Sequence, residues 1–428
     1  MNNFFNTIRS TFIFTNGHYI QTFITEFFVL LAGLLVYKLA ATNFNKEGFA
    51  EYALCRRTIS LMHPVLLLGF AVGIPRFIAM EKFAEDLKIA GTFFVSGLII
   101  SISFSIVVLA LSILIPESIA GFFFNDIGMS PLIFPIAVLV MGLVIHSLYY
   151  SYFRGKFFVA RANIVQFMII GLVPVLILLF NFNVFYTILW TGIVSLSLSI
   201  LIVVMLLIEM EWNISEIGRS GKKLLNYGLQ RIPGDLMLAA FFAIPAFVIA
   251  HQSGKVIGGF VAFSITLIGL VGTSFGPISL LLLPKSAELI VSGNYNKLSE
   301  DVSKILKIVI ISTVTGLIVF EIFAEQILEI YLGYKYDELI LVTRLMILSA
   351  LGYSIYISLR SVLDAYHVKA VNTINIFYSF LLFIFLCTIS IFLNDNYLLI
   401  ITSFILSISV LGWLTYVRYK KIISDHAV

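Results

Sequence analysis

The sequence has few charged residues and only two cysteines. Asp, Glu, Lys and Arg make up 12% of its 428 residues, whereas 60% are hydrophobic; soluble globular domains typically carry about 25% charged residues. Cys55 and Cys387 are too few for a disulfide framework or a cysteine-rich metal cluster. A net charge of +4 is too small to indicate a nucleic-acid partner. These scarcities exclude a soluble protein and predict an integral membrane protein.

Other patterns are also missing. No segment alternates apolar and polar residues as a strand does, so the membrane spans are predicted to be helices. No G-x-x-x-x-G-K-[ST] loop occurs, so ATP is not expected as an energy source. The region around Arg9 lacks the three parts of a cleaved signal peptide, and the first span is predicted to be the targeting signal. We therefore expect a multi-pass, all-α membrane protein without metal or cofactor.

Long apolar windows divide the chain into two groups of six. A membrane-spanning helix needs roughly 20 largely apolar residues, and twelve windows meet this condition. They lie near 19–40, 58–79, 89–115, 131–153, 164–182, 184–208, 224–250, 256–284, 304–328, 339–361, 370–393 and 397–417. The sequence predicts an N-terminal lobe (1–208), a cytoplasmic connection (209–223) and a C-terminal lobe (224–428).

The loop charges predict the orientation of the spans, because Lys and Arg are enriched in cytoplasmic loops. Most of the 27 Lys and Arg residues fall at the N-terminus, in even-numbered connections or at the C-terminus. These residues are Arg9, Arg76, Lys82, Lys88, Arg154, Lys156, Arg161, Arg219, Lys222, Lys223, Lys285, Lys297, Lys304, Lys307, Lys369, Arg418, Lys420 and Lys421. The opposite connections hold Lys46, Arg56, Arg57, Lys255 and Lys335. Both termini are therefore predicted to be cytoplasmic.

Three landmarks recur at an offset of 209 positions. Glu26 matches Asp235, Pro75-Arg76 matches Pro284-Lys285, and Asn163 matches Asn372. Each half has six spans, an even number, so both halves start on the same side of the membrane and have the same orientation. The repeat axis therefore runs along the membrane normal. Such parallel repeats place a site at the interface between halves, so the sequence predicts two six-helix lobes around a cavity that opens alternately, the architecture of a transporter.

The chain resembles the Wzx-type O-antigen flippases, the lipid-linked oligosaccharide translocases of the multidrug/oligosaccharidyl-lipid/polysaccharide (MOP) exporter superfamily. The resemblance is carried by EGFAEYALCRRTIS after the first span, LLNYGLQRIPGDL at the seventh, and ILEIYLGYKYDELILVTRLMILSALGYSIY across the ninth and tenth. It implies movement of undecaprenyl-diphosphate-linked sugars between leaflets of the bacterial inner membrane, coupled to a cation gradient. A polysaccharide polymerase and a chain-length regulator are the protein partners it suggests.

Charge within the seventh span gives the main candidate site. Arg231 and Asp235 in YGLQRIPGDLMLAAFFAIP share one helix face. Arg231 is a candidate for the diphosphate, because a guanidinium binds phosphate oxygens in pairs and stays charged. Asp235 and Glu26 are candidates for H⁺ or Na⁺ coupling. A purely structural ion pair is the alternative for Arg231 and Asp235, and a helix-to-helix hydrogen bond is the alternative for Glu26.

Two further sets of residues are candidates with simpler alternatives. Arg76 and Lys285 could contact headgroup phosphates at the cytoplasmic mouth, but anchoring by positive charge explains them equally well. His146, Tyr149 and Tyr150 could stack on sugars, but an interfacial aromatic belt is simpler.

Three other functions remain open. A multidrug antiporter for cations would need cavity acids without a matching base, which Arg231 argues against. A membrane enzyme of polysaccharide assembly usually needs a large external loop or an exposed His/Asp or paired-carboxylate cluster, and the external connections here are short. A channel fits the two-lobed repeat less well than a carrier does.

Overall fold

The computed structural model describes residues 17–81, 87–366, 371–393 and 396–426, and all regular structure in these ranges is helical. Twelve segments of this part are long and apolar enough to cross a membrane. The helices are α2 (Gly17–Asn43), α3 (Lys46–Leu67), α4 (Phe70–Glu81), α5 (Leu87–Leu114), α6 (Pro116–Phe124), η2 (Ile127–Leu132), α7 (Ile133–Gly155), α8 (Val159–Gln166), η3 (Phe167–Leu172), α9 (Val173–Leu178), α10 (Val184–Glu209), η4 (Ile214–Glu216), α11 (Ile217–Ser253), α12 (Lys255–Val291), α13 (Tyr295–Leu332), α14 (Asp337–Ile347), α15 (Ala350–Tyr366), α16 (Val371–Leu393) and α17 (Tyr397–Ser424). The predicted all-α fold with twelve spans is confirmed.

Contacts divide the chain into two compact units. The described residues of Gln21–Ala262 form the N-terminal unit, and those from Phe263 onward form the main part of the C-terminal unit. The division falls inside α12, which continues across it as one helix. It differs from the predicted lobe boundary at 209–223, because α11 contacts α3, α4 and α5 of the N-terminal unit.

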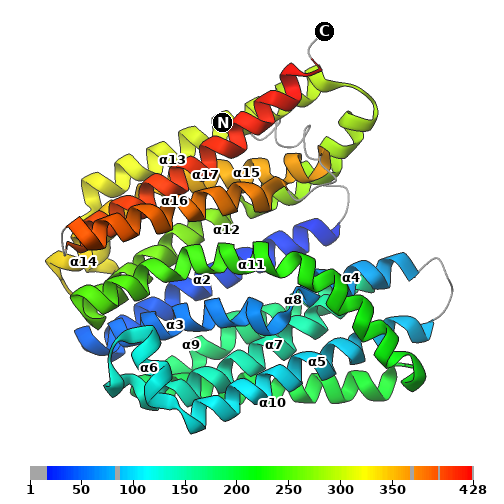
Figure 1. Ribbon diagram of the computed structural model, residues 1–428, viewed down its shortest axis with the longest axis horizontal. Helices are drawn as coiled ribbons and strands as arrows, with labels where there is room; N and C mark the ends of the chain where they lie inside the picture. Colours follow the sequence, from blue (N-terminus) through cyan, green and yellow to red (C-terminus); the bar gives the residue numbers. More distant parts are fainter. Residues whose placement is uncertain (1–16, 82–86, 367–370, 394–395, 427–428) are drawn as a thin grey trace. The chain divides into compact units, whose positions relative to one another are not determined.

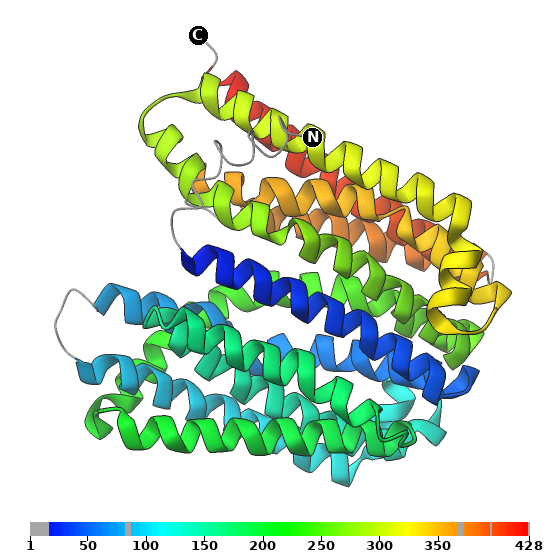
Figure 2. The same cartoon turned by 180° about the vertical axis from the view of Figure 1, so that it is seen from behind.

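Helix α7 lies inside the N-terminal unit, where it contacts α3, α4, α5 and α10 (Figures 1 and 2). A small residue allows a close crossing of α7 and α10, since a Cβ added to Gly142 of α7 would lie 2.9 Å from the backbone nitrogen of Leu196 in α10. In the C-terminal unit, α15 and α17 cross in the same way, since a Cβ on Gly412 would lie 2.4 Å from the carbonyl oxygen of Gly352. The fourth and sixth spans of each half thus cross at glycines.

The second span is longer than predicted and is broken. Its helix begins at Lys46, where the Asn45 side chain accepts a hydrogen bond from the Gly48 amide at 2.8 Å. The predicted start at 58 is therefore wrong, and Lys46, Arg56 and Arg57 lie in the helix rather than in a connection. A hydropathy window misses this part because the helix continues through polar sequence.

The break separates α3 from α4 at Leu68 and Gly69. Both residues have positive φ, 52° and 73°, which is costly for a leucine and routine for a glycine. Pro64 lies one turn before the break, and its carbonyl accepts a hydrogen bond from the Leu68 amide at 3.2 Å. Within membrane proteins, helices are interrupted where protein covers the irregular backbone or where that backbone lines a cavity. The break between α3 and α4 is therefore a candidate position for a binding site.

An ion-pair cluster fixes the opposite end of α3. Lys255 at the start of α12 lies 2.8 Å from Glu51 of α3 and 3.1 Å from Asp126, which precedes η2. Partial burial acts to raise the pKa of Asp126, but hydrogen bonds from Lys255 and the Gly128 amide outweigh it and lower this pKa. The cluster ties three segments of the N-terminal unit together.

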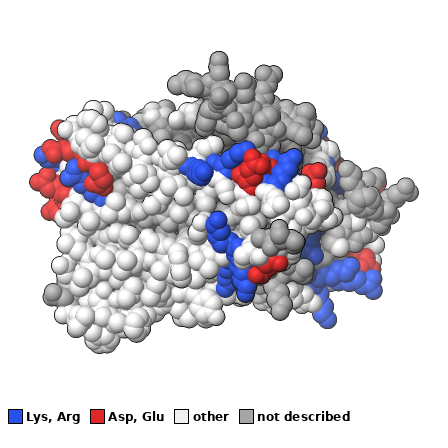
Figure 3. All heavy atoms as spheres, turned by 90° about the horizontal axis from the view of Figure 1, so that it is seen from above, with Lys and Arg blue, Asp and Glu red and all other residues white. Residues whose placement is uncertain are grey.

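Charged side chains form separate groups on the surface. Figure 3 shows Lys, Arg, Asp and Glu gathered in patches, with a wide surface between them that carries none. Large apolar side chains are exposed along many helices, including Phe104, Ile113, Phe122, Leu201 and Phe385. This distribution is expected of helices that face lipid.

Candidate functional site

The predicted pair of charges on α11 forms. The Nε atom of Arg231 lies 3.1 Å from the Oδ2 atom of Asp235, one helical turn away. The two side chains are 39% and 40% exposed in the structure. Because α11 continues without interruption through Pro233 and Gly234, the pair stays on one face. At these exposures neither side chain of the pair is fully buried.

Arg76 is positioned beside the same helix. Its guanidinium lies over the ring of Tyr227, with 4.9 Å between the Cζ atom and the ring centroid. Tyr227 precedes Arg231 by four residues, so the two arginines flank one turn of α11. The Tyr227 ring also meets Phe77 of α4 edge-on at 5.9 Å. The geometry thus brings Arg76 and the Arg231–Asp235 pair to neighbouring positions on α4 and α11.

The break after α3 sets how closely α11 approaches. A Cβ added to Gly228 would lie 2.1 Å from the Leu68 carbonyl oxygen, and one added to Gly69 would lie 3.6 Å from the Cβ atom of Arg231. Only a glycine at 228 permits this contact. The contact fixes Arg231, one turn further along α11, next to the interrupted backbone.

Glu26 belongs to a second group of side chains. Arg154 of α7 is the cation that acts electrostatically on Glu26, and both groups act on Tyr150. The Arg154 guanidinium lies 5.8 Å from the centroid of the Tyr150 ring. Among the described residues, Glu26 is therefore associated with Arg154, whereas Asp235 is associated with Arg231. The two acids matched by the repeat have separate basic partners.

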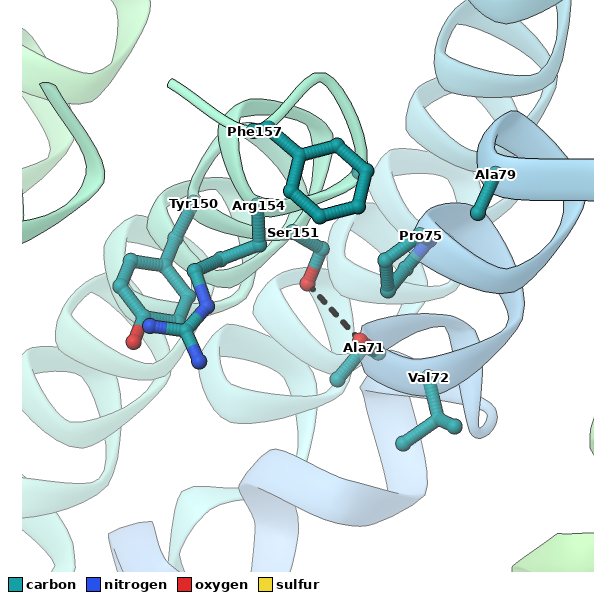
Figure 4. A pocket seen from close by; sticks show the side chains of 9 residues that line it. Ala71, Val72, Pro75, Ala79, Tyr150, Ser151, Arg154 and Phe157 are labelled. Carbon is teal, nitrogen blue, oxygen red and sulfur yellow. Dashed lines mark hydrogen bonds between the residues drawn. The ribbon is translucent and has the colours of Figure 1, made fainter. Parts of the chain in front are cut away.

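A cavity adjoins this second group. It has a volume of about 440 Å³ and lies between α4 and the end of α7. Figure 4 shows Arg154 and Tyr150 on one side of it, with Pro75, Val72 and the ring of Phe157 around it. The remaining lining residues are Ala71, Ala79, Ser151 and Gly155. Arg154 is the one charged residue of the lining.

A proline explains one hydrogen bond of the cavity wall. Pro75 has no N–H, so the carbonyl of Ala71, four residues earlier, receives no hydrogen bond from that position of the helix. The Ser151 hydroxyl donates to this carbonyl at 3.1 Å and also to the Ser147 carbonyl at 2.6 Å (Figure 4). Helix α7 thus supplies a donor for the backbone acceptor that Pro75 leaves open in α4.

The aromatic residues predicted to meet sugars divide into two groups. His146 is 2% exposed and Tyr149 is fully buried, because α7 lies inside the unit; the Tyr149 hydroxyl is 3.5 Å from the Ser199 hydroxyl. In this structure neither side chain is accessible to a sugar, which corrects that expectation. Tyr150 is half-buried and lines the cavity. The His146 ring stacks on Tyr150 from the interior, with 5.9 Å between centroids.

Lys285 lies in the C-terminal unit and has an acidic partner. Its ammonium group is 2.7 Å from the Asp301 carboxylate, and the two side chains are 28% and 13% exposed. Its charge is balanced by Asp301, as that of Arg231 is by Asp235, and the Lys285 side chain is the less exposed of the two cations, 28% against 39%. Phosphate contact and anchoring both stay predictions for Lys285.

The sequence interpretation overlooked two residues of the site. Arg154 counted only as a cytoplasmic charge, and Tyr227 was not considered. The available signal was helical spacing, because Arg154 follows Tyr150 by four residues and Tyr227 precedes Arg231 by four.

No group of three or more His, Cys, Asp or Glu side chains that could hold a metal ion occurs among the described residues. The basic residues of the site are suited to anions, and the carboxylates beside them are suited to a proton or a monovalent cation.

Comparisons with known proteins identify the fold. No protein-family model matches the sequence, and no curated protein matches it. Solved structures match over almost the whole chain. One described as an inward-facing multidrug resistance MATE family transporter of the MOP superfamily has 15% identity and a TM-score of 0.75, and covers 93% of this chain and 95% of its own.

Two further structures agree. A MOP superfamily transporter from Pyrococcus furiosus, described as having a binding pocket of reverse polarity that suggests a different function, has 13% identity and a TM-score of 0.67, with 96% of each chain covered. A eukaryotic MATE transporter has 12% identity and a TM-score of 0.64, with 96% of this chain and 99% of its own covered. The protein therefore has the twelve-helix fold of the MOP superfamily transporters.

Proposed function

We propose that the protein is a flippase that moves undecaprenyl-diphosphate-linked oligosaccharide from the cytoplasmic to the periplasmic leaflet of a bacterial inner membrane. The observation that carries this proposal is the accessible Arg231 within the seventh span, paired with Asp235 on the same helix. A guanidinium at such a position has a cost in lipid and is usually functional. Its planar, paired donors suit a diphosphate.

The pair also suggests how transport is coupled to a cation gradient. A diphosphate that binds Arg231 competes with the Asp235 carboxylate for the same donors. Asp235, once released, loses a stabilising cation and gains affinity for H⁺ or Na⁺. Glu26 beside Arg154 has the same chemistry in a second location. In this mechanism the diphosphate occupies Arg231 while the coupling ion occupies Asp235, and both are released when the ion pair forms again during alternating access.

The orientation follows from the loop charges, with both termini in the cytoplasm. In this proposal Arg76, which lies over Tyr227, receives the headgroup before Arg231 does. A polymerase and a chain-length regulator would act on the delivered units. The alternative is a multidrug antiporter, which the names of several structural neighbours favour. Against it, a cationic drug would have to displace Arg231 from Asp235.

The test is the amount of undecaprenyl-diphosphate-linked oligosaccharide in membranes, measured by mass spectrometry. A deletion strain should accumulate it, and the wild-type gene should clear it. Arg231→Ala should slow clearance by roughly ten- to a hundredfold, the loss expected for charge-assisted hydrogen bonds. Clearance by Arg231→Lys should lie between that of wild type and that of Arg231→Ala, because lysine keeps the charge but lacks the paired donors of a guanidinium.

Arg219→Ala is the matched control. Arg219 also lies on α11 and is paired with an acid, Glu216, at 3.1 Å, but its side chain is 72% exposed near the start of the helix. Clearance by this variant should equal that of wild type at equal protein levels. Normal clearance by Arg231→Ala would refute the site. No accumulation in the deletion strain would favour the antiporter, which dye efflux would then test.

A further inference from the structure

The cavity between α4 and α7 has the composition of a site for an anion carried on an apolar body. Its volume of about 440 Å³ lies within the usual range of ligand pockets. Ala71, Val72, Pro75 and Ala79 form an apolar wall, and the rings of Tyr150 and Phe157 form the other sides (Figure 4). The hydroxyl of Ser151 is already engaged by backbone carbonyls. Arg154 is left as the main donor to a ligand.

Arg154 is available for an anion. No described carboxylate lies within ion-pair distance of it, and Glu26 acts on it only from further away. Its guanidinium is oriented alongside the Tyr150 ring, which restricts its rotamers without using its hydrogen bonds. A guanidinium in this state presents paired donors that match a phosphate.

The edge of the cavity is apolar and basic. Phe157 has a positive φ of 61° and is 60% exposed, and Phe158 beside it is also exposed. Arg161 lies 5.2 Å from the centroid of the Phe158 ring, outside the cavity. On the α4 side, Val72 and Met80 are exposed. Apolar groups at the rim and one cation within are the arrangement expected where a lipid headgroup binds and its chains stay in the bilayer.

We propose that this cavity binds the phosphate of a membrane lipid whose headgroup carries a net negative charge, with Arg154 as the ligand of the phosphate and with Tyr150 and Phe157 as its walls. The site is distinct from the Arg231–Asp235 pair, since Arg76 next to Pro75 faces α11 and not this cavity. The proposal concerns binding and does not depend on the flippase function.

The experiment is a lipid titration of the purified full-length protein in detergent, followed by native mass spectrometry. The probes are dioleoyl phosphatidic acid, dioleoyl phosphatidylcholine with the same chains, and inorganic phosphate. Phosphatidic acid should bind wild type more tightly than phosphatidylcholine does. Arg154→Ala should weaken phosphatidic acid binding by about tenfold or more. The control variant Arg161→Ala should bind phosphatidic acid as tightly as wild type does.

Four outcomes would overturn the proposal. Equal binding of phosphatidic acid by wild type and Arg154→Ala would exclude this arginine, and equal binding of the two lipids would exclude recognition of the phosphate charge. Competition by inorganic phosphate at the concentration at which the lipid binds would mean a site for free anions. If Arg154→Ala fails to fold, Val72→Trp fills the cavity from the opposite wall. Retained lipid binding in that variant would exclude the cavity.

Discussion

Gly228 is where α11 touches the backbone between α3 and α4. An added methyl group would lie 2.1 Å from the Leu68 carbonyl oxygen, and backbone cannot rotate away as a side chain can. Gly228→Ala should therefore lower the free energy of unfolding by about 1–3 kcal/mol, the usual cost of overpacking. This difference in the free energy of unfolding can be measured by unfolding both proteins in mixed detergent–SDS micelles.

Gly218 on the same helix is the control. An added Cβ there would meet nothing within 4 Å, and the residue is exposed. Gly218→Ala should be neutral or stabilising by about 0.5–1 kcal/mol, because alanine loses less backbone entropy in a helix. If both variants had the same stability as wild type, the close contact at Gly228 would not exist.

Single residues were predictable where the signal is local. Arg231 and Asp235 are four apart in one span, and helical geometry alone predicts their pairing, which is confirmed. The electrostatic influence of Arg154 on Glu26 acts between α7 and α2, so it depends on how helices pack, and spacing within one helix carries no information on it. The burial of His146 and Tyr149 could not be predicted for the same reason. An apolar helix such as α7 can face lipid or other helices, and its sequence does not distinguish the two.

At the level of an element, α4 depends on a hydroxyl from another helix. Ser151 supplies the hydrogen bond that Pro75 cannot give to the Ala71 carbonyl. Ser151→Ala should cost about 0.5–1.5 kcal/mol, the usual net contribution of a hydrogen bond, because the Ala71 carbonyl is only partly buried at the cavity wall. In a Pro75→Ala background, the restored backbone N–H donates to the carbonyl, so the same serine substitution should cost less. The double-mutant cycle reports the difference directly.

Ser103→Ala serves as the control for that cycle. The Ser103 hydroxyl donates to the Ile99 carbonyl in its own helix, on the exposed side of α5. Its removal leaves the backbone bonds of α5 intact and should change stability by less than about 0.5 kcal/mol. Additive effects of Ser151 and Pro75 would contradict the assigned role of the hydroxyl.

Elements were predicted well at their apolar centres and poorly at their ends. The windows located the spans, but α3 begins at Lys46 and α13 extends over Tyr295–Leu332, both beyond the apolar windows. Polar residues extend these helices, so hydropathy cannot mark their limits. The break at Leu68 was also invisible, because Pro64 is followed by an unbroken apolar run and positive φ at a leucine has no sequence signal.

For the whole molecule, orientation in the membrane is the main untested prediction. Helix α13 has 38 residues and spans roughly 57 Å at about 1.5 Å per residue, so both ends clear a bilayer of about 40–45 Å including headgroups. Lys297 in the first turn of α13 and Lys335 just after its end are exposed. Lys335→Cys should react with an impermeant maleimide on intact cells. Lys297→Cys should react only after permeabilisation.

The native cysteines provide the background for this labelling. Cys55 and Cys387 are buried, so wild type should stay unlabelled in both conditions. Labelling of Lys297→Cys from outside, with Lys335→Cys protected, would reverse the predicted orientation and place both termini outside.

The all-α membrane fold could be predicted from composition, but the division of the chain into two units could not. Loop length and charge suggested a boundary at 209–223, whereas contacts place α11 with the preceding helices and divide α12 after Ala262. Gly228 against Leu68 and Tyr227 against Arg76 are among the contacts that hold α11 there. Such contacts between distant segments are set by tertiary packing, and no local pattern reports them.

The Arg231–Asp235 pair has a consequence for biogenesis. An isolated Arg or Asp at the centre of a span costs about 2.5–3.5 kcal/mol during insertion by the translocon. Because the two side chains lie one turn apart, they can neutralise each other as soon as α11 is helical, before any other span arrives. The seventh span can therefore leave the translocon for the bilayer by itself, and the nascent chain need not hold it back to await a partner helix.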